Sequence, residues 1–447
     1  MTPGITIGRA GGLILAAPAS GSGKTLLTLG LLRLLRDRGL RPAAAKAGPD
    51  YIDPTFHQAA SGGVCLNLDV WAMRPATLRA LVGSLDAAAD IVLCEGVMGL
   101  FDGAGPDGET GSTAALARLT GWPVVLVVDT RRQGASAAAL VAGFARHDPA
   151  VPVAGVVFNR VAGARHRALL EAALARHLPA LPCLGAVPQD PALVLPERHL
   201  GLVPAGEQRA EASIARAALA VAAGIDVERL LSLARPATIE EHTPALPLPP
   251  LGQRIAVARD DAFVFAYPAV LRGWQCQGAE LSWFSPLAGE PPDPAADVVY
   301  LPGGYPELHA GRLAAAERFL AGLREGAADG KAIYGECGGY MTLGEALTDA
   351  DGRAHRMAGL LPLATSFAER RLHLGYRTAT LIAGGPLGAA GARFRGHEFH
   401  YATTIAAGGD APLFALADSC GAELNPAGLR RGSVMGSFVH LIDRADY

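Results

Sequence analysis

Two short motifs in this chain of 447 residues carry the residue types of two different reactions. Residues 18–25 (PASGSGKT) have the composition of a loop that binds the phosphates of a nucleotide. Residues 335–340 (GECGGY) have the glycine–nucleophile–glycine spacing of a sharp turn that exposes a thiol. The first site would use a nucleoside triphosphate, and the second would attack a carbonyl group. The commonest reason to combine the two is to release ammonia at one site and consume it at the other.

The phosphate-binding motif lies between an apolar stretch and a leucine-rich stretch, which predicts a strand, a loop and a helix. Backbone N–H groups of four loop residues would surround the phosphates: Ser20, Gly21, Ser22 and Gly23. Lys24 would reach the β- and γ-phosphates, and the Thr25 hydroxyl would bind Mg²⁺. Pro18 replaces the first glycine of the strict pattern. An ordinary glycine- and serine-rich turn is the alternative, but a Gly-Lys-Thr sequence between a strand and a helix favours phosphate binding.

Charged residues at the ends of the next two predicted strands extend this site. Lys46 and Asp50 follow the second strand, whereas Glu95 and Asp102 follow the next one. Because strand ends at one edge of a doubly wound sheet converge on the ligand crevice, we expect Lys46 to meet phosphate and Glu95 to bind Mg²⁺. Asp50 and Asp102 could each hold metal or substrate.

Turn formation is the alternative for some of these carboxylates. Asp50 follows Pro49 and Asp53 precedes Pro54, whereas Asp102 lies in a glycine-rich segment. Each of these aspartates could cap a turn instead. Asn159 follows the fifth predicted strand and could bind the base of the nucleotide.

The cysteine motif needs a base and an oxyanion site. His440 is predicted to end the last strand and is the candidate base that would take the proton of the Cys337 thiol. Residues 302–307 follow another predicted strand, and the backbone N–H groups of Gly304 and Gly338 could form an oxyanion hole. For the other five cysteines we expect buried structural thiols: Cys65, Cys94, Cys183, Cys276 and Cys420.

The elements that must position these residues alternate along the chain between short apolar runs and helix-like stretches. This alternation predicts an α/β fold with two doubly wound domains, at 1–234 and 253–447, joined by a proline-rich linker at 235–252. The predicted strands are 13–17, 42–46, 91–94, 124–128, 153–158, 255–258, 298–301, 331–334 and 433–439. The predicted helices are 24–38, 75–89, 111–120, 134–146, 207–223, 262–274 and 312–326.

Composition excludes some classes of function. The net charge of −3 gives no sign of a surface for nucleic acid or membrane, so we expect neither as a partner. The six cysteines form no CxxC pair, and the N-terminus lacks the pattern of a signal peptide. We therefore expect reduced thiols and a cytoplasmic enzyme.

Five separated motifs resemble, in order, the cobyrinic acid and hydrogenobyrinic acid a,c-diamide synthases of cobalamin biosynthesis. They are KAGPDYIDPTFH at 46–57, EGVMGLFDG at 95–103, LPGGYPE at 301–307, GECGGYM at 335–341 and GSFVH at 436–440. The first half of the chain resembles dethiobiotin-synthetase-like P-loop enzymes. The second half resembles class I glutamine amidotransferases, which have a flavodoxin-like fold. The stretch 65–74 resembles the branch that acts on hydrogenobyrinic acid.

The resemblance implies that ATP·Mg²⁺ phosphorylates the a- and c-acetate side chains of a corrin and that ammonia from L-glutamine converts each acyl phosphate into an amide. It implies nucleotide or metal binding by Lys24, Thr25 and Glu95. It also places the acid substrate near five residues: Asp50, Tyr51, Ile52, Glu95 and Asp102. Many class I amidotransferases have a glutamate two residues after the histidine, where this chain has Ile442. No third member of the Cys337–His440 relay is therefore assigned.

Several alternatives stay open at this point. Cobyric acid synthases share the plan but amidate other side chains, and CTP synthases also join a P-loop synthetase to a glutaminase. A MinD/ParA-like ATPase switch would carry a lysine where this chain has Ala19, and it would not need Cys337 or His440. A catalytically inactive amidotransferase fold is disfavoured by the same two residues. The presence of cobalt in the corrin, the order of amidation and the oligomeric state, a homodimer included, are not readable from the sequence.

Overall fold

The computed structural model describes residues 10–105, 107–193, 197–198, 201–202, 208–239 and 246–445. These residues form two compact units. The first contains the described residues up to Trp71 and from Pro75 to Ile239, and the second contains Ala72–Arg74 and the residues from Leu246 onward. Of the predicted linker 235–252, residues 240–245 lie outside the described residues, as does residue 207 of the predicted helix 207–223.

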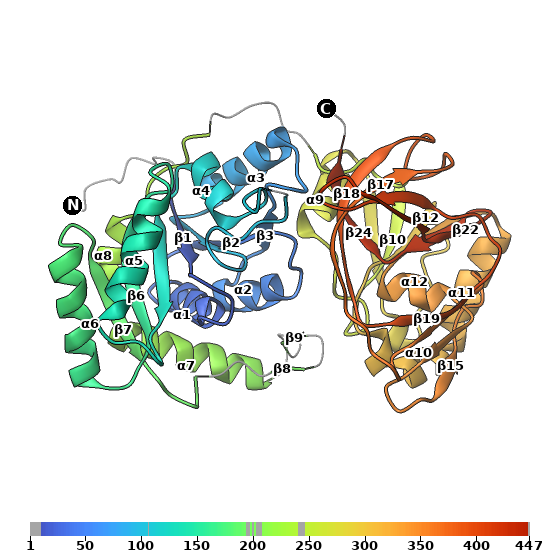
Figure 1. Ribbon diagram of the computed structural model, residues 1–447. Coiled ribbons are helices and arrows are strands. Elements are labelled where there is room, and N and C mark those ends of the chain that lie inside the picture. Colours follow the sequence, from blue (N-terminus) through green and yellow to red (C-terminus); the bar gives the residue numbers. More distant parts are fainter. Residues whose placement is uncertain are drawn as a thin grey trace, which may run out of the picture. The chain divides into compact units, whose positions relative to one another are not determined.

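The first unit is built on a parallel sheet in the order β3-β2-β4-β1-β5-β6-β7 (Figure 1). Its strands are β1 (Gly11–Ala16), β2 (Pro42–Ala47), β3 (Cys65–Leu68), β4 (Ile91–Glu95), β5 (Val124–Asp129), β6 (Val153–Val161) and β7 (Cys183–Pro188). A separate hairpin pairs β8 (Glu197–Arg198) with β9 (Gly201–Leu202). The central strands are almost entirely buried, which explains why their sequences are continuous apolar runs without polar alternation.

Helices connect these parallel strands, and two more, α7 (Gln208–Gly224) and α8 (Val227–Ser232), follow the last strand. The connecting helices are α1 (Lys24–Asp37), α2 (Asp53–Ser61), α3 (Pro75–Ala88), α4 (Thr113–Thr120), α5 (Ser136–His147) and α6 (Ala164–His177). The leucine-rich α1 packs against α2 and α7 and buries most of its apolar residues, so the helix that begins at the phosphate loop is firmly anchored. Ser112 caps α4 by accepting a hydrogen bond from the Ala115 backbone N–H at 3.1 Å.

The second unit contains a six-stranded sheet in the order β11-β10-β12-β13-β23-β22. Its strands are β10 (Arg254–Ala258), β11 (Glu280–Phe284), β12 (Val298–Leu301), β13 (Ala332–Glu336), β22 (Leu429–Arg431) and β23 (Val434–Ser437), of which only β22 is antiparallel to its neighbour. Its helices are α9 (Pro268–Cys276), α10 (Ala310–Ala315), α11 (Glu317–Ala328) and α12 (Gly338–Leu343), with short 3₁₀ turns at Pro286–Ala288 and Pro306–Leu308.

Two further sheets in this unit were not predicted. A four-stranded sheet contains β14 (Ala346–Thr348), β15 (Ala354–Arg356), β16 (Leu363–Ser366) and β19 (Thr403–Ala407). An antiparallel five-stranded sheet contains β17 (His373–Leu381), β18 (Arg393–His400), β20 (Phe414–Ala417), β21 (Glu423–Ala427) and β24 (Val439–Arg444). The class predicted for the fold, α/β with doubly wound sheets, is confirmed in both units.

Three predicted elements are wrong in detail. The predicted helix 262–274 begins only at Pro268, because Phe265 instead pairs its backbone with Gly303. The predicted helix 312–326 is two helices, α10 and α11, which are separated by Ala316 at a ψ of 64°. The predicted strand 433–439 is interrupted at Phe438, where the chain leaves the six-stranded sheet and enters the five-stranded one.

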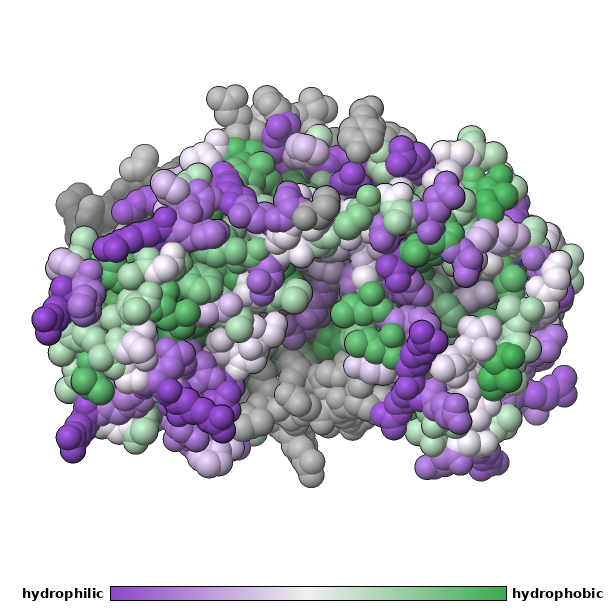
Figure 2. All heavy atoms as spheres, in the orientation of Figure 1, coloured by the Kyte–Doolittle hydropathy of each residue, from purple (hydrophilic) through white to green (hydrophobic). Residues whose placement is uncertain are grey.

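Hydrophilic and hydrophobic residues are interspersed over the visible surface of each unit (Figure 2). Large exposed apolar side chains among the described residues include Met98, Leu219, Leu374 and Ile405. None of the described helices is both long enough and apolar enough to cross a membrane.

Candidate active sites

The phosphate loop connects β1 to α1 through two glycines with left-handed backbone angles. Gly21 has a φ of 75° and Gly23 a φ of 90°, which residues with a side chain rarely adopt. Asn159 donates a hydrogen bond from Nδ2 to the Ser22 carbonyl oxygen at 2.8 Å. A Cβ atom on Gly23 would lie 2.2 Å from that same Nδ2 atom. Asn159, predicted to contact the nucleotide, is thus the side chain that holds the loop in shape.

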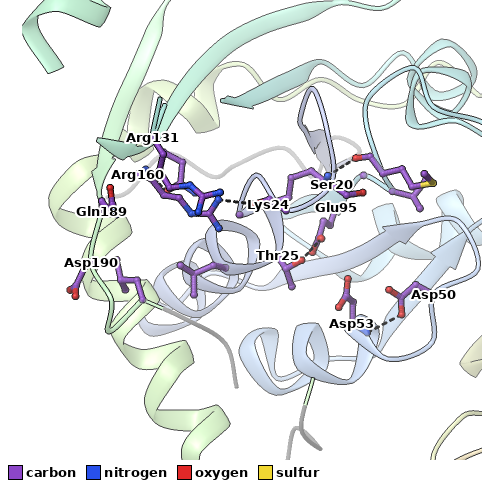
Figure 3. Close-up of a pocket in the computed structure, with 18 of the residues that line it drawn as sticks. Ser20, Lys24, Thr25, Asp50, Asp53, Glu95, Arg131, Arg160, Gln189 and Asp190 are labelled. Carbon is purple, nitrogen blue, oxygen red and sulfur yellow. Dashed lines mark hydrogen bonds between the residues drawn. The ribbon is translucent and has the colours of Figure 1, made fainter. Parts of the chain in front are cut away.

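Lys24 and Thr25 begin α1 and point toward the end of β4 (Figure 3). The Lys24 ammonium donates a hydrogen bond to the Met98 carbonyl oxygen. Burial lowers the pKa of Lys24 to about 8, although the nearby Glu95 carboxylate partly opposes this shift. The Thr25 hydroxyl donates to Glu95 Oε1 at 2.7 Å. The hydroxyl that the motif supplies therefore contacts the carboxylate that ends β4, and the lysine contacts the backbone just beyond that strand.

Glu95 is the centre of a buried charge cluster. It ends β4 beside Lys46 of β2, and the Lys46 Nζ atom lies 2.9 Å from Glu95 Oε1 and 2.6 Å from Asp53 Oδ2. His57 Nε2 lies 2.7 Å from Glu95 Oε2. Burial opposes ionisation of Glu95, but Lys46 and His57 hold its pKa well below the usual range. Burial together with the charge of Asp50 raises the pKa of Asp53.

All of these groups except His57 line a cavity of ≈ 670 Å³. Figure 3 shows Thr25 and Glu95 between two arginines on one side and Asp50 and Asp53 on the other. The lining includes nine residues predicted for the site from the sequence: Ser20, Gly21, Gly23, Lys24, Thr25, Lys46, Asp50, Glu95 and Asn159. Among the described residues, four predicted ones are outside this lining: Ser22, Tyr51, Ile52 and Asp102.

Turn capping accounts for the observed contacts of two predicted carboxylates. Asp50 Oδ1 accepts hydrogen bonds from the backbone N–H groups of Ile52 at 2.8 Å and Asp53 at 3.1 Å, so it shapes the entry to α2 while also lining the cavity. Asp102 is exposed, and its Oδ2 atom accepts from the Gly99 N–H at 2.9 Å. The side chain of Tyr51 is buried.

Sequence reasoning missed His57 and Arg160. His57 lies one helical turn after Asp53, and its Nδ1 atom is 2.6 Å from the Asp53 carbonyl oxygen. Arg160 has a φ of 58° and donates to the Gly21 carbonyl oxygen and to Asp129 Oδ2, both at 2.6 Å. The helical spacing from Asp53 was the available signal for His57. Nothing in the sequence indicated that Arg160 would turn back to the phosphate loop.

In the second unit, Cys337 occupies a strained turn between β13 and α12. Its φ of 45° and ψ of −101° are uncommon for a residue with a side chain, and the Cys337 N–H donates to the Ser437 carbonyl oxygen at 2.8 Å. Burial raises the pKa of the thiol, with Glu307 adding to the shift. The geometry is that of a nucleophile turn, and burial favours the neutral thiol over the thiolate.

His440 is brought next to Cys337 from a different sheet. It is the second residue of β24, so the prediction that it ends a strand is wrong. A Cβ atom on Gly303 would lie 2.3 Å from His440 Cε1 and 3.3 Å from Cys337 Cβ, so all three residues crowd the same point. Burial, reinforced by His397 and His400, lowers the pKa of His440 to about 3, which leaves the ring neutral and able to accept a proton.

The two predicted oxyanion glycines also lie together. A Cβ atom on Gly338 would be 2.9 Å from the Gly304 backbone nitrogen. Gly338 begins α12, so its N–H group is at a helix N-terminus, and its hydrogen bond to the Cys337 sulfur lowers the pKa of that thiol against the effect of burial. The arrangement places two backbone nitrogens beside the nucleophile.

Near this turn, His373, Glu398 and His400 place potential metal-binding atoms within 4.8 Å of one another. The two imidazole rings stack with an interplanar angle of 7° and a centroid distance of 4.6 Å. A metal ion bound by both rings would have to lie in both ring planes, which this parallel stacking does not allow. Glu398 instead pairs with Arg377 at 2.7 Å and with His400 at 3.0 Å, so the cluster is a charge network.

Comparison with known proteins follows the same division of the chain. Residues 13–203 match the CobQ/CobB/MinD/ParA nucleotide binding domain, and residues 254–446 match the CobB/CobQ-like glutamine amidotransferase domain. Hydrogenobyrinate a,c-diamide synthase of Rhizobium meliloti is 55% identical over 97% of this chain and 99% of its own length. The proteins of the same name from Rhodobacter capsulatus and Brucella anthropi are 56% and 54% identical, over 96% and 97% of this chain and 98% of their own lengths. With this identity along almost its whole length, the chain belongs to the hydrogenobyrinate a,c-diamide synthase family.

Proposed function

We propose that this protein converts the a- and c-acetate side chains of hydrogenobyrinic acid into amides, using ATP to activate each carboxylate and glutamine as the source of nitrogen. The identity of more than half of the residues with relatives that carry this name is the observation that carries the proposal. The two candidate sites support it, because one has the groups to activate a carboxylate and the other has the groups to hydrolyse an amide.

In the first unit, the phosphate loop would bind the ATP phosphates through its backbone N–H groups and Lys24. A substrate carboxylate oxygen attacks the γ-phosphorus, the bond to the β,γ-bridging oxygen breaks, and ADP leaves with an acyl phosphate as the product. Ammonia then attacks the acyl carbon, loses a proton and expels phosphate, which leaves the amide. Lys46 would balance negative charge that develops on the phosphoryl group, since its ammonium is buried beside Glu95.

The hydroxyl of Thr25 and the carboxylate of Glu95 are hard oxygen donors 2.7 Å apart, and Asp50 lines the same cavity. This donor set fits Mg²⁺, which would neutralise charge on the β- and γ-phosphates when it is bound. The Glu95 carboxylate would then be shared between the Lys46 ammonium and the metal ion. The Thr25 oxygen would keep its lone pairs available to the cation while its hydrogen is donated to Glu95.

In the second unit, the Cys337 thiol would give its proton to His440 as the sulfur attacks the glutamine side-chain carbonyl carbon. The oxygen that becomes negative would accept hydrogen bonds from the Gly304 and Gly338 N–H groups. His440 returns the proton to the departing nitrogen, so ammonia leaves and a thioester stays on the sulfur. Water hydrolyses the thioester to glutamate and restores the thiol.

The test is incubation of the enzyme with ATP, glutamine and either hydrogenobyrinic or cobyrinic acid, followed by mass spectrometry of the corrin. We expect two successive replacements of OH by NH₂ on hydrogenobyrinic acid. No mass change on either corrin would overturn the proposed reaction, and reaction only of the cobalt-containing acid would overturn the proposed substrate.

The Cys337→Ser variant tests the division of labour between the sites. It should lose amidation with glutamine and retain amidation with added ammonium salt. Loss of both activities in a folded variant would contradict separate sites for ammonia release and carboxylate activation.

A further inference from the structure

The position where many amidotransferases carry the third relay carboxylate is apolar in this protein. Ile442, two residues after His440, is buried. Asp443 is also buried, but its two oxygens accept from the Arg74 backbone N–H and guanidinium at 2.8 Å, both contacts lying within the second unit. Asp443 is therefore already paired with an arginine.

A different carboxylate faces the histidine. Glu336 Oε2 lies 3.8 Å from His440 Nδ1, and both side chains are buried. Glu336 is the last residue of β13 and immediately precedes Cys337, so the strand that delivers the nucleophile also delivers this acid. In the parallel pairing of β13 with β23, Glu336 stands opposite Ser437, three residues before His440.

The Glu336 carboxylate is held by three donors. Its Oε2 atom accepts a hydrogen bond from the Tyr300 hydroxyl at 2.8 Å, and its Oε1 atom accepts from the Tyr334 hydroxyl at 3.0 Å and from the Leu441 N–H at 3.1 Å. Tyr300 and Tyr334 are paired across β12 and β13, and their rings stack at 5.9 Å. Three strands, β12, β13 and β24, thus supply hydrogen bonds to the buried carboxyl group, as a buried polar group requires.

We propose that Glu336 is the positioning residue of the glutaminase: it orients the His440 ring through Nδ1 and stabilises the imidazolium that forms when Cys337 loses its proton. A separation of 3.8 Å is longer than a hydrogen bond, and such contacts often shorten only when the substrate is bound. This inference rests on the proposed glutaminase activity. It replaces the absent downstream glutamate by a residue adjacent to the nucleophile.

The charges around this pair set the expected pH dependence. Burial raises the pKa of Glu336 to about 7, against the hydrogen bonds from Tyr300, Leu441 and Tyr334. Other titratable groups near His440 are His397, His400 and Glu398 from β18, and Glu307 and Glu398 act on the Cys337 thiol. The carboxylate form of Glu336 supports catalysis, so glutaminase activity should fall as Glu336 is protonated.

The experiment is a pH profile of glutamine hydrolysis for the full-length wild type and the Glu336→Gln variant. We expect the variant to lose about 10²- to 10⁴-fold in kcat at neutral pH, as in other relays whose orienting carboxylate becomes an amide, while KM for glutamine stays within about twofold. The acid limb near neutral pH should disappear with the carboxylate. Unchanged kcat, or an unchanged acid limb, would overturn the proposal.

Two further sets of variants separate positioning from folding. Tyr300→Phe and Tyr334→Phe each remove one hydrogen bond from the carboxylate and should shift the acid limb upward while retaining most of kcat. Glu280→Gln changes an exposed acid on β11 and should behave as wild type. Ammonium-dependent corrin amidation reports that the first unit of Glu336→Gln is folded, and the retained KM for glutamine reports the same of the second unit. Failure of the wild type itself to hydrolyse glutamine would instead contradict the proposed function.

Discussion

His57 Nε2 lies 2.7 Å from Glu95 Oε2, and both side chains are buried. The other ring nitrogen of His57 faces the Asp53 carbonyl oxygen, so the imidazole connects the start of α2 to the end of β4. His57 thereby fixes the orientation of the carboxylate that Thr25 and Lys46 also contact.

The first prediction concerns this contact. His57→Ala should destabilise the first unit by about 2 kcal/mol, since it removes a buried hydrogen bond to a charged group. It should also lower corrin amidation about 10- to 100-fold with either glutamine or ammonium, because Glu95 loses its fixed orientation. Initial rates with both nitrogen sources check this. Glutamine hydrolysis should be unaffected, and His177→Ala, at an exposed position of α6, is the control.

A loss confined to the glutamine-dependent rate would contradict this assignment of His57. Such a result would mean that the histidine serves the glutaminase or its link to the synthetase, and not the activation of the carboxylate.

The second prediction concerns Gly303. Gly303→Ala should lower glutamine hydrolysis about 10²-fold, because the added Cβ would lie 2.3 Å from His440 Cε1 and would move the ring away from Cys337. Gly311→Ala is the matched control, since its Cβ would meet only His355 at an ordinary 3.6 Å. Steady-state kinetics of glutamine hydrolysis by the two variants test this prediction. Equal activities would contradict it and show that the His440 ring can shift without loss of function.

The third prediction is a dependence of stability on pH. The pKa of Glu336 is raised from 4.5 to about 7 in the folded protein, so its contribution to stability is complete below pH 4.5 and is lost as the pH rises through 7. Between about pH 5 and pH 8 this loss amounts to about 2–3 kcal/mol. Hydrogen exchange of the β12 and β13 amides should show it in the wild type. The same pH slope in Glu336→Gln would contradict the assignment.

The fourth prediction concerns Asn159. Asn159→Ala removes the hydrogen bond to the Ser22 carbonyl oxygen and should raise KM for ATP about 3- to 10-fold, which corresponds to a buried hydrogen bond of about 1 kcal/mol. Corrin amidation at varied ATP concentration measures this effect. Asn425→Ala, at an exposed position of β21, should leave KM unchanged. An Asn159→Ala variant with wild-type KM would show that the loop keeps its shape without this contact.

Local patterns predicted five strands of the first unit's sheet and the helices α1, α3, α4, α5 and α7, because these elements alternate at ordinary lengths. The elements that were missed include β3, β7, α2, α6 and α8. β3 (Cys65–Leu68) contains Asn67 and is only four residues long. The two extra sheets of the second unit depend on pairings between distant segments, such as His397 with His440, which no local pattern contains.

The candidate site residues show the same limit. Loop and strand-end chemistry pointed to Lys24, Thr25, Glu95 and Cys337, each of which lies where one element ends and the next begins. Glu336 lies inside the cysteine motif, but its proximity to His440 arises only when the six-stranded and five-stranded sheets pack together. The spacing after the histidine directed attention to position 442 instead, where this chain has isoleucine.

The change of sheet at Phe438 has a further consequence. Phe438 stacks on the His400 ring at a centroid distance of 3.8 Å and contacts the Tyr340 ring edge-on at 5.2 Å. The residue between the two sheets is thus held by aromatic contacts on both sides. Cys337 follows β13 of the six-stranded sheet, whereas His440 lies in β24 of the five-stranded sheet. A chain in which only one of these two sheets has formed has Cys337 without its base, or His440 without its nucleophile. Glutamine would therefore not be hydrolysed until both sheets had formed and packed together. Ammonia release would then indicate that the second unit is fully folded.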